Sequence, residues 1–304
     1  MKEFTSDIII VGSGMAGLTA AIYAMRAGKS ASVFCGSNPG GKITSSFNVE
    51  NYPGILSISG QDLGDTMLKQ AKNFGVNILY KTVKELNASV KSVTDSEQNV
   101  YSAKGIIIAT GMQNRKSSAV DARKFEGNGI SYCAVCDGPL YRGKTAAVIG
   151  GGNSALSEAL YLSDICEKVY IIHRRQDFRA EKYLIKKAEL VKNIICIMNT
   201  TVLSFNGNDT LKSIDVLCKG NRETISVDAV FPAIGYVPQS SLYKDIVTTD
   251  TTGFAITDEN CTTNVEGIYV AGDCRQKPVR QLTTAAADGT AAAFNCCNYI
   301  DSLA

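Results

Sequence analysis

The sequence predicts an α/β protein made of two βαβ units, with the second unit inserted in the first. In each unit a short apolar strand enters a Gly-rich loop, and a helix and another strand follow. The loops are Gly12-Ser13-Gly14-Met15-Ala16-Gly17 and Gly150-Gly151-Gly152-Asn153-Ser154-Ala155. One such loop is weak evidence, because Gly-rich turns are common. Two loops, each between a strand and a helix, indicate two Rossmann-like dinucleotide-binding domains.

The first unit follows this pattern from its first strand. Residues 7–11 are a β-rich run that enters Gly12, and residues 16–27 read as a buried helix that stops at Gly28. Residues 31–34 supply the next strand. The N-terminus of such a helix directs backbone amides and the positive end of its dipole toward a pyrophosphate.

The second unit repeats the order. A strand is expected at 146–149, a helix at about 154–162 and another strand at 169–172, and the apolar run 229–235 closes the unit.

The remaining segments return to the first unit. Apolar strands at 105–111 and 267–273 end in small residues, so a bulky group could approach the backbone there, and an Ala-rich helix is expected over 282–299. We therefore predict a discontinuous first domain, residues 1–114 and 245–304, and an inserted domain, residues 115–244, with crossings near 113–117 and 240–247.

Composition excludes several classes of protein. A net charge of +2 gives no electrostatic footprint for nucleic acid, and no apolar run approaches the roughly 18 residues of a membrane helix. The polar residues 1–7 precede only a short apolar run, which is not a signal peptide. Most cysteines lie in or beside apolar segments, as free thiols do. These features favour a cytoplasmic protein that binds neither nucleic acid nor membrane.

The run Cys133-Ala134-Val135-Cys136-Asp137-Gly138 lies just before the second loop. Such a pair could be half a zinc site, a structural disulfide or a redox pair. Zinc needs four ligands, and the chain offers only the adjacent pair Cys296-Cys297 and the single histidine His173. A reducing compartment disfavours a structural disulfide. We therefore predict no metal and a redox dithiol, with Asp137 as the group that handles the proton, unless Asp137 merely forms a turn.

The chain resembles the low-molecular-weight thioredoxin reductases, flavoenzymes in which an NADPH domain interrupts an FAD domain. The Cys-x-x-Cys-Asp-Gly run before the second Gly-rich loop is the specific part of the match. The resemblance also rests on Gly12–Gly17, 40–44, 49–54, 109–111, Gly150–Ala155, 173–180, 257–259, 272–273 and 280–281. It implies a homodimer that passes electrons from NADPH through FAD to thioredoxin.

By this resemblance each cofactor has an expected set of residues. FAD would lie on Gly12, Ser13, Gly14, Ala16, Cys35, Gly36, Gly40, Gly41, Lys42, Asn51, Val83, Thr110, Gly111, Gly272, Asp273, Arg280 and Gln281. The nicotinamide nucleotide would lie on Gly150, Gly152, Asn153, Ser154, Ala155, His173, Arg174, Arg175 and Arg179.

The end of the strand at 169–172 indicates which nicotinamide is used. An NAD site usually has Asp or Glu there, whereas this strand is followed by Arg174, Arg175 and Arg179. Guanidinium groups match a 2′-phosphate in charge and geometry. NADPH is therefore preferred, and the alternative is a solvated basic turn. His173 is expected to be a cofactor neighbour or a packing residue.

The resemblance assigns different roles to the two thiols. Cys136 would stack on the flavin and Cys133 would attack thioredoxin. Because nicotinamide and dithiol need the same flavin, the family rotates one domain against the other, and the two crossings would be the hinges.

Two departures leave alternatives open. Cys35-Gly36 replace the acid of many FAD sites, and Pro139-Leu140 replace the aromatic pair that helps receive thioredoxin.

Rival functions are a ferredoxin-dependent reductase or dithiol oxidase, an NADPH–ferredoxin reductase, which would lack the dithiol, and a flavin redox sensor without turnover.

Overall fold

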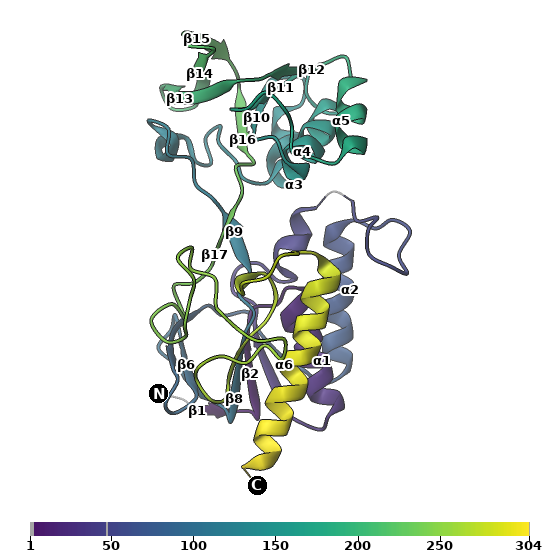
Figure 1. Cartoon of the computed structure of the whole chain (residues 1–304), viewed down its shortest axis with the longest axis vertical. Helices are drawn as coiled ribbons and strands as arrows, with labels where there is room; N and C mark the ends of the chain where they lie inside the picture. The colour runs from purple at the N-terminus through teal and green to yellow at the C-terminus, as the bar shows by residue number, and fades with distance from the viewer. Residues whose placement is uncertain (1–2, 47, 304) are drawn as a thin grey trace. The chain divides into compact units, whose positions relative to one another are not determined.

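The computed structural model describes residues 3–46 and 48–303 and divides into two compact units. Unit 1 is Met1–Gln113 with Val237–Ala304, and unit 2 is Asn114–Tyr236. The chain passes between the units through β9 (Met112–Asn114) and β17 (Tyr236–Pro238), which pair as a two-stranded sheet (Figure 1).

The second boundary lies earlier than the residue 245 expected from the sequence. Unit 1 resumes at Val237 because the following segment packs into its core. The Tyr243 side chain is completely buried there, and its hydroxyl donates to the carbonyl of Cys274 at 3.0 Å. Residues 237–244 therefore belong to unit 1.

Unit 1 is built on a five-stranded sheet in the order β18-β8-β2-β3-β4, with every neighbouring pair parallel. The strands are β2 (Ile8–Val11), β3 (Ala31–Phe34), β4 (Asn77–Leu79), β8 (Gly105–Ile108) and β18 (Ile268–Val270). Parallel strands present their carboxyl ends at one edge. Gly12, Cys35, Ala109 and Ala271 follow directly at this edge.

Layers cover both faces of this sheet. One face packs Ile8 and Ile10 against α1 (Met15–Arg26), α2 (Gly60–Asn73) and α6 (Leu282–Ser302). The other face packs Ile9 and Val11 against a four-stranded sheet in the order β1-β7-β6-β5. These strands are β1 (Glu3–Thr5), β5 (Val83–Asn87), β6 (Ser92–Asp95) and β7 (Val100–Ser102).

Unit 2 has a four-stranded parallel sheet in the order β12-β11-β10-β16. Its strands are β10 (Thr145–Ile149), β11 (Lys168–Ile172), β12 (Ile194–Ile197) and β16 (Ala229–Pro232). Val148 faces the core that includes α4, while Ala147 faces an antiparallel sheet. The helices are α3 (Ala134–Asp137), α4 (Asn153–Ser163) and α5 (Lys182–Glu189), and the antiparallel strands are β13 (Thr200–Gly207), β14 (Leu211–Cys218) and β15 (Asn221–Ser226).

The predicted α/β fold class is confirmed. Both strand–loop–helix–strand segments form as expected, and the predicted C-terminal helix is α6. The antiparallel sheet β13-β14-β15 was not predicted from the sequence. Within residues 3–46 and 48–303, no helix has both the length and the apolar character needed to cross a bilayer.

Candidate functional site

The first Gly-rich loop leaves β2 in a backbone conformation that favours glycine. Gly12 has a φ of +115°, and a Cβ there would collide with the carbonyl of Ala109. Gly14 is the N-cap of α1 and carries no side-chain cap, so the first amides of the helix are open to an anion. Ala16, buried in the first turn, packs beneath the Gly272 turn.

A second segment closes on this loop. A Cβ on Gly41 would lie 2.6 Å from the Cα of Gly14, so the two backbones are in close approach. The amide of Gly40 donates to the buried hydroxyl of Ser13 at 3.3 Å. Burial raises the pKa of the Cys35 thiol, which keeps it protonated as a packing group.

The other predicted FAD residues of unit 1 lie on several different elements. Thr110 and Gly111 follow β8, and the exposed Asn51 donates to the Gln281 side chain at 3.3 Å. Val83 lies on β5 of the other sheet, where its neighbour Lys81 accepts through its carbonyl from the Gly36 amide at 3.1 Å. Lys42 is exposed on the short helix Gly41–Ser45.

Two polar atoms in this region are buried without a hydrogen-bond partner among the described residues, Asp273 Oδ1 and Arg280 Nε. The Arg280 guanidinium stacks over the Phe254 ring at 4.1 Å. An orphaned acceptor and an orphaned donor beside open helix amides fit a ligand with hydroxyls and phosphates. The residues present therefore fit FAD.

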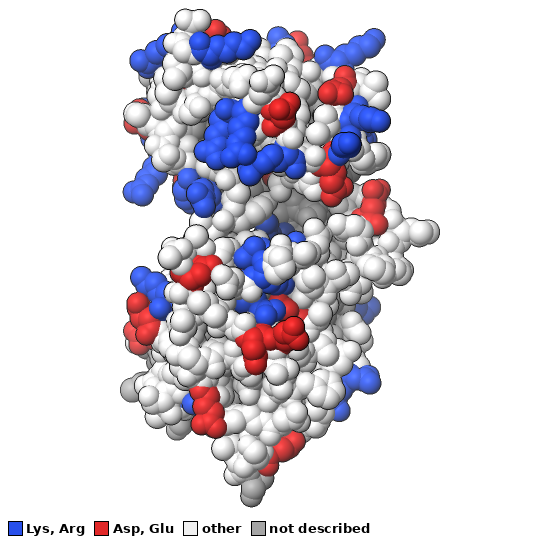
Figure 2. Space-filling model, in the orientation of Figure 1, with Lys and Arg blue, Asp and Glu red and all other residues white. Residues whose placement is uncertain are grey.

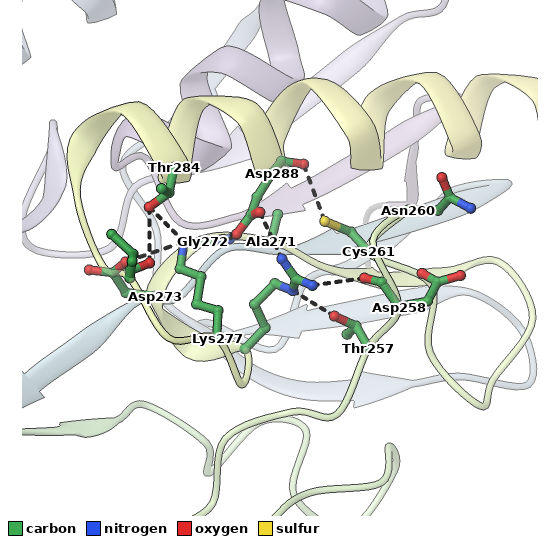
Figure 3. A network of polar contacts seen from close by, with 12 residues as sticks. Thr257, Asp258, Asn260, Cys261, Ala271, Gly272, Asp273, Lys277, Thr284 and Asp288 are labelled. Carbon is green, nitrogen blue, oxygen red and sulfur yellow. Dashed lines mark hydrogen bonds and ion pairs between the residues drawn. The ribbon is translucent and has the colours of Figure 1, made fainter.

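A charged cluster next to Asp273 was not predicted from the sequence. Asp288 of α6, which is 8% exposed, pairs with Arg275 at 2.8 Å and with Lys277 at 2.9 Å (Figure 3). It also accepts from the Gly272 amide at 3.0 Å. An acidic residue inside an Ala-rich apolar helix was the signal that could have indicated it.

In unit 2 the second Gly-rich loop has the same form. Gly150 has a φ of +155°, and a Cβ there would lie 3.0 Å from the Cβ of the buried Ala155. A Cβ on Gly151 would collide with the His173 ring, whereas one on Gly152, the N-cap of α4, would meet nothing within 4 Å. The space in front of Gly152 is open.

Side chains at the start of α4 are oriented by hydrogen bonds. Asn153 donates to the Glu181 carboxylate at 2.9 Å and accepts from the Glu181 amide at 2.8 Å. The hydroxyls of Ser154 and Tyr236 lie 3.1 Å apart.

His173 is buried behind this loop and stacks on Phe178, with ring centroids 5.7 Å apart. Burial lowers the pKa of His173, and the neighbouring guanidinium groups lower it further. Arg174, Arg175 and Arg179 are exposed, and they form no ion pair with any residue in the described ranges. In Figure 2, Lys and Arg side chains gather on the drawn face of unit 2.

Cys133 and Cys136 form a disulfide, with Cα atoms 5.3 Å apart. Cys133 is the N-cap of the short helix α3, and its Sγ accepts from the Cys136 amide at 3.2 Å. Cys136 is exposed and Cys133 is half-buried. The Ser131 hydroxyl accepts from the Cys133 amide at 3.1 Å. Asp137 follows directly and is half-buried.

The helix that carries the disulfide is fixed against α4. A Cβ on the buried Gly138 would lie 3.0 Å from Leu162 and 3.3 Å from Tyr161, so the backbone of this helix packs closely on those two side chains. The eight other cysteines are free thiols, among them Cys296 and Cys297. Among the residues that the structure describes, no group of three or more His, Cys, Asp or Glu side chains could hold a metal ion.

Comparison with known proteins identifies the family to which the chain belongs. The family model of the pyridine nucleotide-disulphide oxidoreductases matches residues 6–289. A thioredoxin reductase of Mycoplasma genitalium is 40% identical over 292 residues, which cover 94% of this chain and 92% of that protein. A thioredoxin reductase of Listeria monocytogenes is 39% identical over 307 residues, covering 99% and 96%.

A solved structure agrees with these relatives. The crystal structure of thioredoxin reductase from Lactococcus lactis, in its FR conformation, has a TM-score of 0.93 and 34% identity, and covers 98% of this chain and 99% of that one. The chain therefore belongs to the pyridine nucleotide-disulphide oxidoreductase family and, within it, to the low-molecular-weight thioredoxin reductases.

Proposed function

We propose that the chain is a thioredoxin-disulfide reductase that uses NADPH as donor, FAD as carrier and the Cys133–Cys136 pair as the exchanging dithiol. The observation that carries the proposal is the disulfide itself. It closes in the unit that also holds the Gly150–Ala155 loop and the unpaired arginines. The relatives named above carry the name thioredoxin reductase and align with this chain over more than nine-tenths of their own length.

FAD is assigned to unit 1. The open amides at the start of α1 would bind its pyrophosphate, the close backbones of Gly14 and Gly41 would line it, and the orphaned atoms of Asp273 and Arg280 would bind its polar groups. Ser13, Ala16, Cys35 and Gly36 would complete the wall of the site.

NADPH is assigned to unit 2. Its pyrophosphate would lie at the start of α4 in front of Gly152, and its 2′-phosphate would pair with Arg174, Arg175 and Arg179. The neutral His173 would support the loop from behind. This assignment is supported by the basic, rather than acidic, end of β11.

The dithiol performs the exchange. When bound, FAD would pass the electron pair of NADPH to the disulfide, and with two protons the Cys133–Cys136 bond would open to two thiols. The Cys133 thiolate then attacks a sulfur of the thioredoxin disulfide, and the first thioredoxin thiol leaves. Cys136 attacks Cys133 in the mixed disulfide, so the Cys133–Cys136 bond forms again and thioredoxin leaves with two thiols.

Two features of the chain assist this exchange. The Cys136 amide, aimed at Cys133 Sγ, favours the thiolate because it donates to the charged form. We assign to Asp137 the transfer of a proton to and from the thiols, since no other ionisable side chain lies within the run Cys133–Gly138. Leu140, which is 71% exposed, offers an apolar contact for thioredoxin.

The remaining expectations come from the family. We propose a homodimer, which analytical ultracentrifugation of the holoprotein tests, and a domain rotation about β9 and β17. A cytoplasmic location is supported by the eight free thiols. A ferredoxin-dependent reductase or dithiol oxidase remains the alternative, and the exposed arginines after β11 favour NADPH over it.

The test follows flavin absorbance. Purified protein is mixed anaerobically with NADPH or NADH, and thioredoxin and a thiol reagent are then added. We expect NADPH to bleach the flavin and thioredoxin thiols to appear. C133S should keep the bleaching and lose the thiols. C166S, at a free cysteine whose pKa burial raises to about 11, should keep both. A flavin that NADPH leaves oxidised would contradict the donor assignment.

A further inference from the structure

The turn after β18 is tied to α6 by one carboxylate. Asp288 Oδ2 accepts from the Gly272 amide at 3.0 Å and from Lys277 Nζ at 2.9 Å, while Oδ1 accepts from Arg275 at 2.8 Å (Figure 3). The carboxylate is therefore held on both oxygens by charged or backbone donors, and it cannot rotate without breaking one of them.

The helix that carries Asp288 is itself held close to the turn. A Cβ on Gly289 would collide with the carbonyl of Ala16, so α6 lies directly against α1. Gly272 has a φ of +81°, and a Cβ there would lie 2.8 Å from that of Ala16. The turn is thus pressed between two helices, and Asp288 fixes its backbone.

Lys277 connects this fixed carboxylate to Asp273. Its side chain is only 6% exposed, and Nζ lies 2.9 Å from Asp288, 3.3 Å from the Thr284 hydroxyl and 3.6 Å from Asp273 Oδ1. The last distance is an ion pair but too long for a hydrogen bond. Asp273 Oδ1 is therefore oriented by a cation and still has its acceptor capacity available.

We propose that Asp288 and Lys277 are positioning residues for the flavin site: they fix the Gly272–Asp273 turn and aim the free acceptor of Asp273 at the hydroxyls of the cofactor. Arg275 holds the outer side of the cluster, since it also donates to Thr257 at 2.6 Å and to the Asp258 carbonyl at 2.8 Å. The inference rests on the assignment of FAD to unit 1.

The charges of the cluster predict opposite shifts in the midpoint potential of the bound flavin, which loss of folding would not produce. Asp273, Asp288, Arg275 and Lys277 sum to zero. D288N removes a negative charge and K277M removes a positive one. Reduced flavin carries more negative charge than oxidised flavin, so D288N should raise the midpoint potential of the bound flavin and K277M should lower it.

The experiment uses full-length protein stripped of flavin and titrated with FAD. D288N and K277M should each raise the FAD dissociation constant at least tenfold, and the midpoint potentials should shift in opposite directions. D7N is the matched control. Asp7 is also held by a lysine and by Ser30, at 2.9 and 2.8 Å, but it precedes β2 at the opposite edge of the sheet.

The outcomes separate clearly. FAD affinity in both variants no weaker than in D7N, or potentials that move in the same direction, would overturn the inference. If D288N does not fold, K277M decides alone. Failure of the wild-type protein to bind FAD would instead contradict the proposed function, so the two failures are distinguishable.

Discussion

Replacement of Gly152 by alanine tests whether a nucleotide approaches the second loop. Gly152 is the N-cap of α4, with φ of −103° and ψ of −177°, an extended conformation that alanine adopts without strain. A Cβ there would meet nothing within 4 Å. The protein alone gives no steric reason for glycine at this position, so any requirement for it comes from a ligand.

The expected effect on folding is small. Alanine is a poorer N-cap than glycine by about 0.5–1 kcal/mol, and the stiffer unfolded chain offsets this by about 0.4–1 kcal/mol. The free energy of unfolding should therefore change by less than about 0.5 kcal/mol. If the pyrophosphate lies against this backbone, the added methyl group displaces it, and the NADPH dissociation constant should rise at least about tenfold, or about 1.4 kcal/mol.

The neighbouring glycine supplies the contrast. In G151A the new methyl group must displace the buried His173 ring, so this variant should lose about 1–3 kcal/mol of folding free energy. For both variants, urea unfolding measures the free energy of unfolding, and fluorescence titration measures the NADPH dissociation constant. Wild-type NADPH affinity in a folded G152A protein would refute the assignment of the phosphate to this loop.

Three further predictions follow from the same contacts. Burial lowers the pKa of His173 in the folded protein below its ordinary value of 6.5. As the pH falls, this imidazole is therefore protonated in the unfolded chain before it is protonated in the folded one. The free energy of unfolding should therefore be fully retained above pH 6.5 and fall below it, and H173Q should show a flatter pH profile in urea melts. The double variant R174Q/R175Q should weaken NADPH binding at least about tenfold without affecting NADH, whereas R222Q, at an exposed ion pair of the same unit, should change neither; equal losses for both nucleotides would exclude 2′-phosphate recognition. Y243F removes the hydroxyl that donates to the buried Cys274 carbonyl at 3.0 Å and should cost about 0.5–1.5 kcal/mol in urea unfolding, and an unchanged midpoint would remove Tyr243 as the anchor of the boundary.

The sequence predicted the parts of the fold that depend on local pattern. Buried parallel strands read as continuous apolar runs, and Gly12 and Gly150 mark positions where φ is positive and a Cβ would strike backbone or a buried side chain. The Cys133–Cys136 pair could also be predicted, because two cysteines separated by two residues need only a short helix to bring their sulfurs together.

The parts that failed depend on contacts between distant segments. The second boundary was placed too late because nothing near Tyr243 indicates that its ring is buried in the apolar cluster that also holds residues of β2 and β8. The Asp288 cluster joins residues of α6 to a turn that lies 11 to 16 positions earlier, and no local motif encodes that pairing. The strands of the antiparallel sheet β13-β14-β15 have mixed exposure. Their apolar and polar residues alternate only weakly, so the sequence pattern did not predict them.

The position of α4 agrees with the part proposed for a flavin. Its first residues belong to the second Gly-rich loop, and its last turn packs α3 through Gly138 against Tyr161 and Leu162. The dithiol and the phosphate loop therefore lie near opposite ends of one helix of 11 residues, a separation of about 16 Å at 1.5 Å per residue. In the proposed function an electron carrier held by unit 1 would bridge this separation, because each feature would then need to reach only the carrier. The acceptor left free on Asp273 is the kind of contact by which unit 1 would hold that carrier.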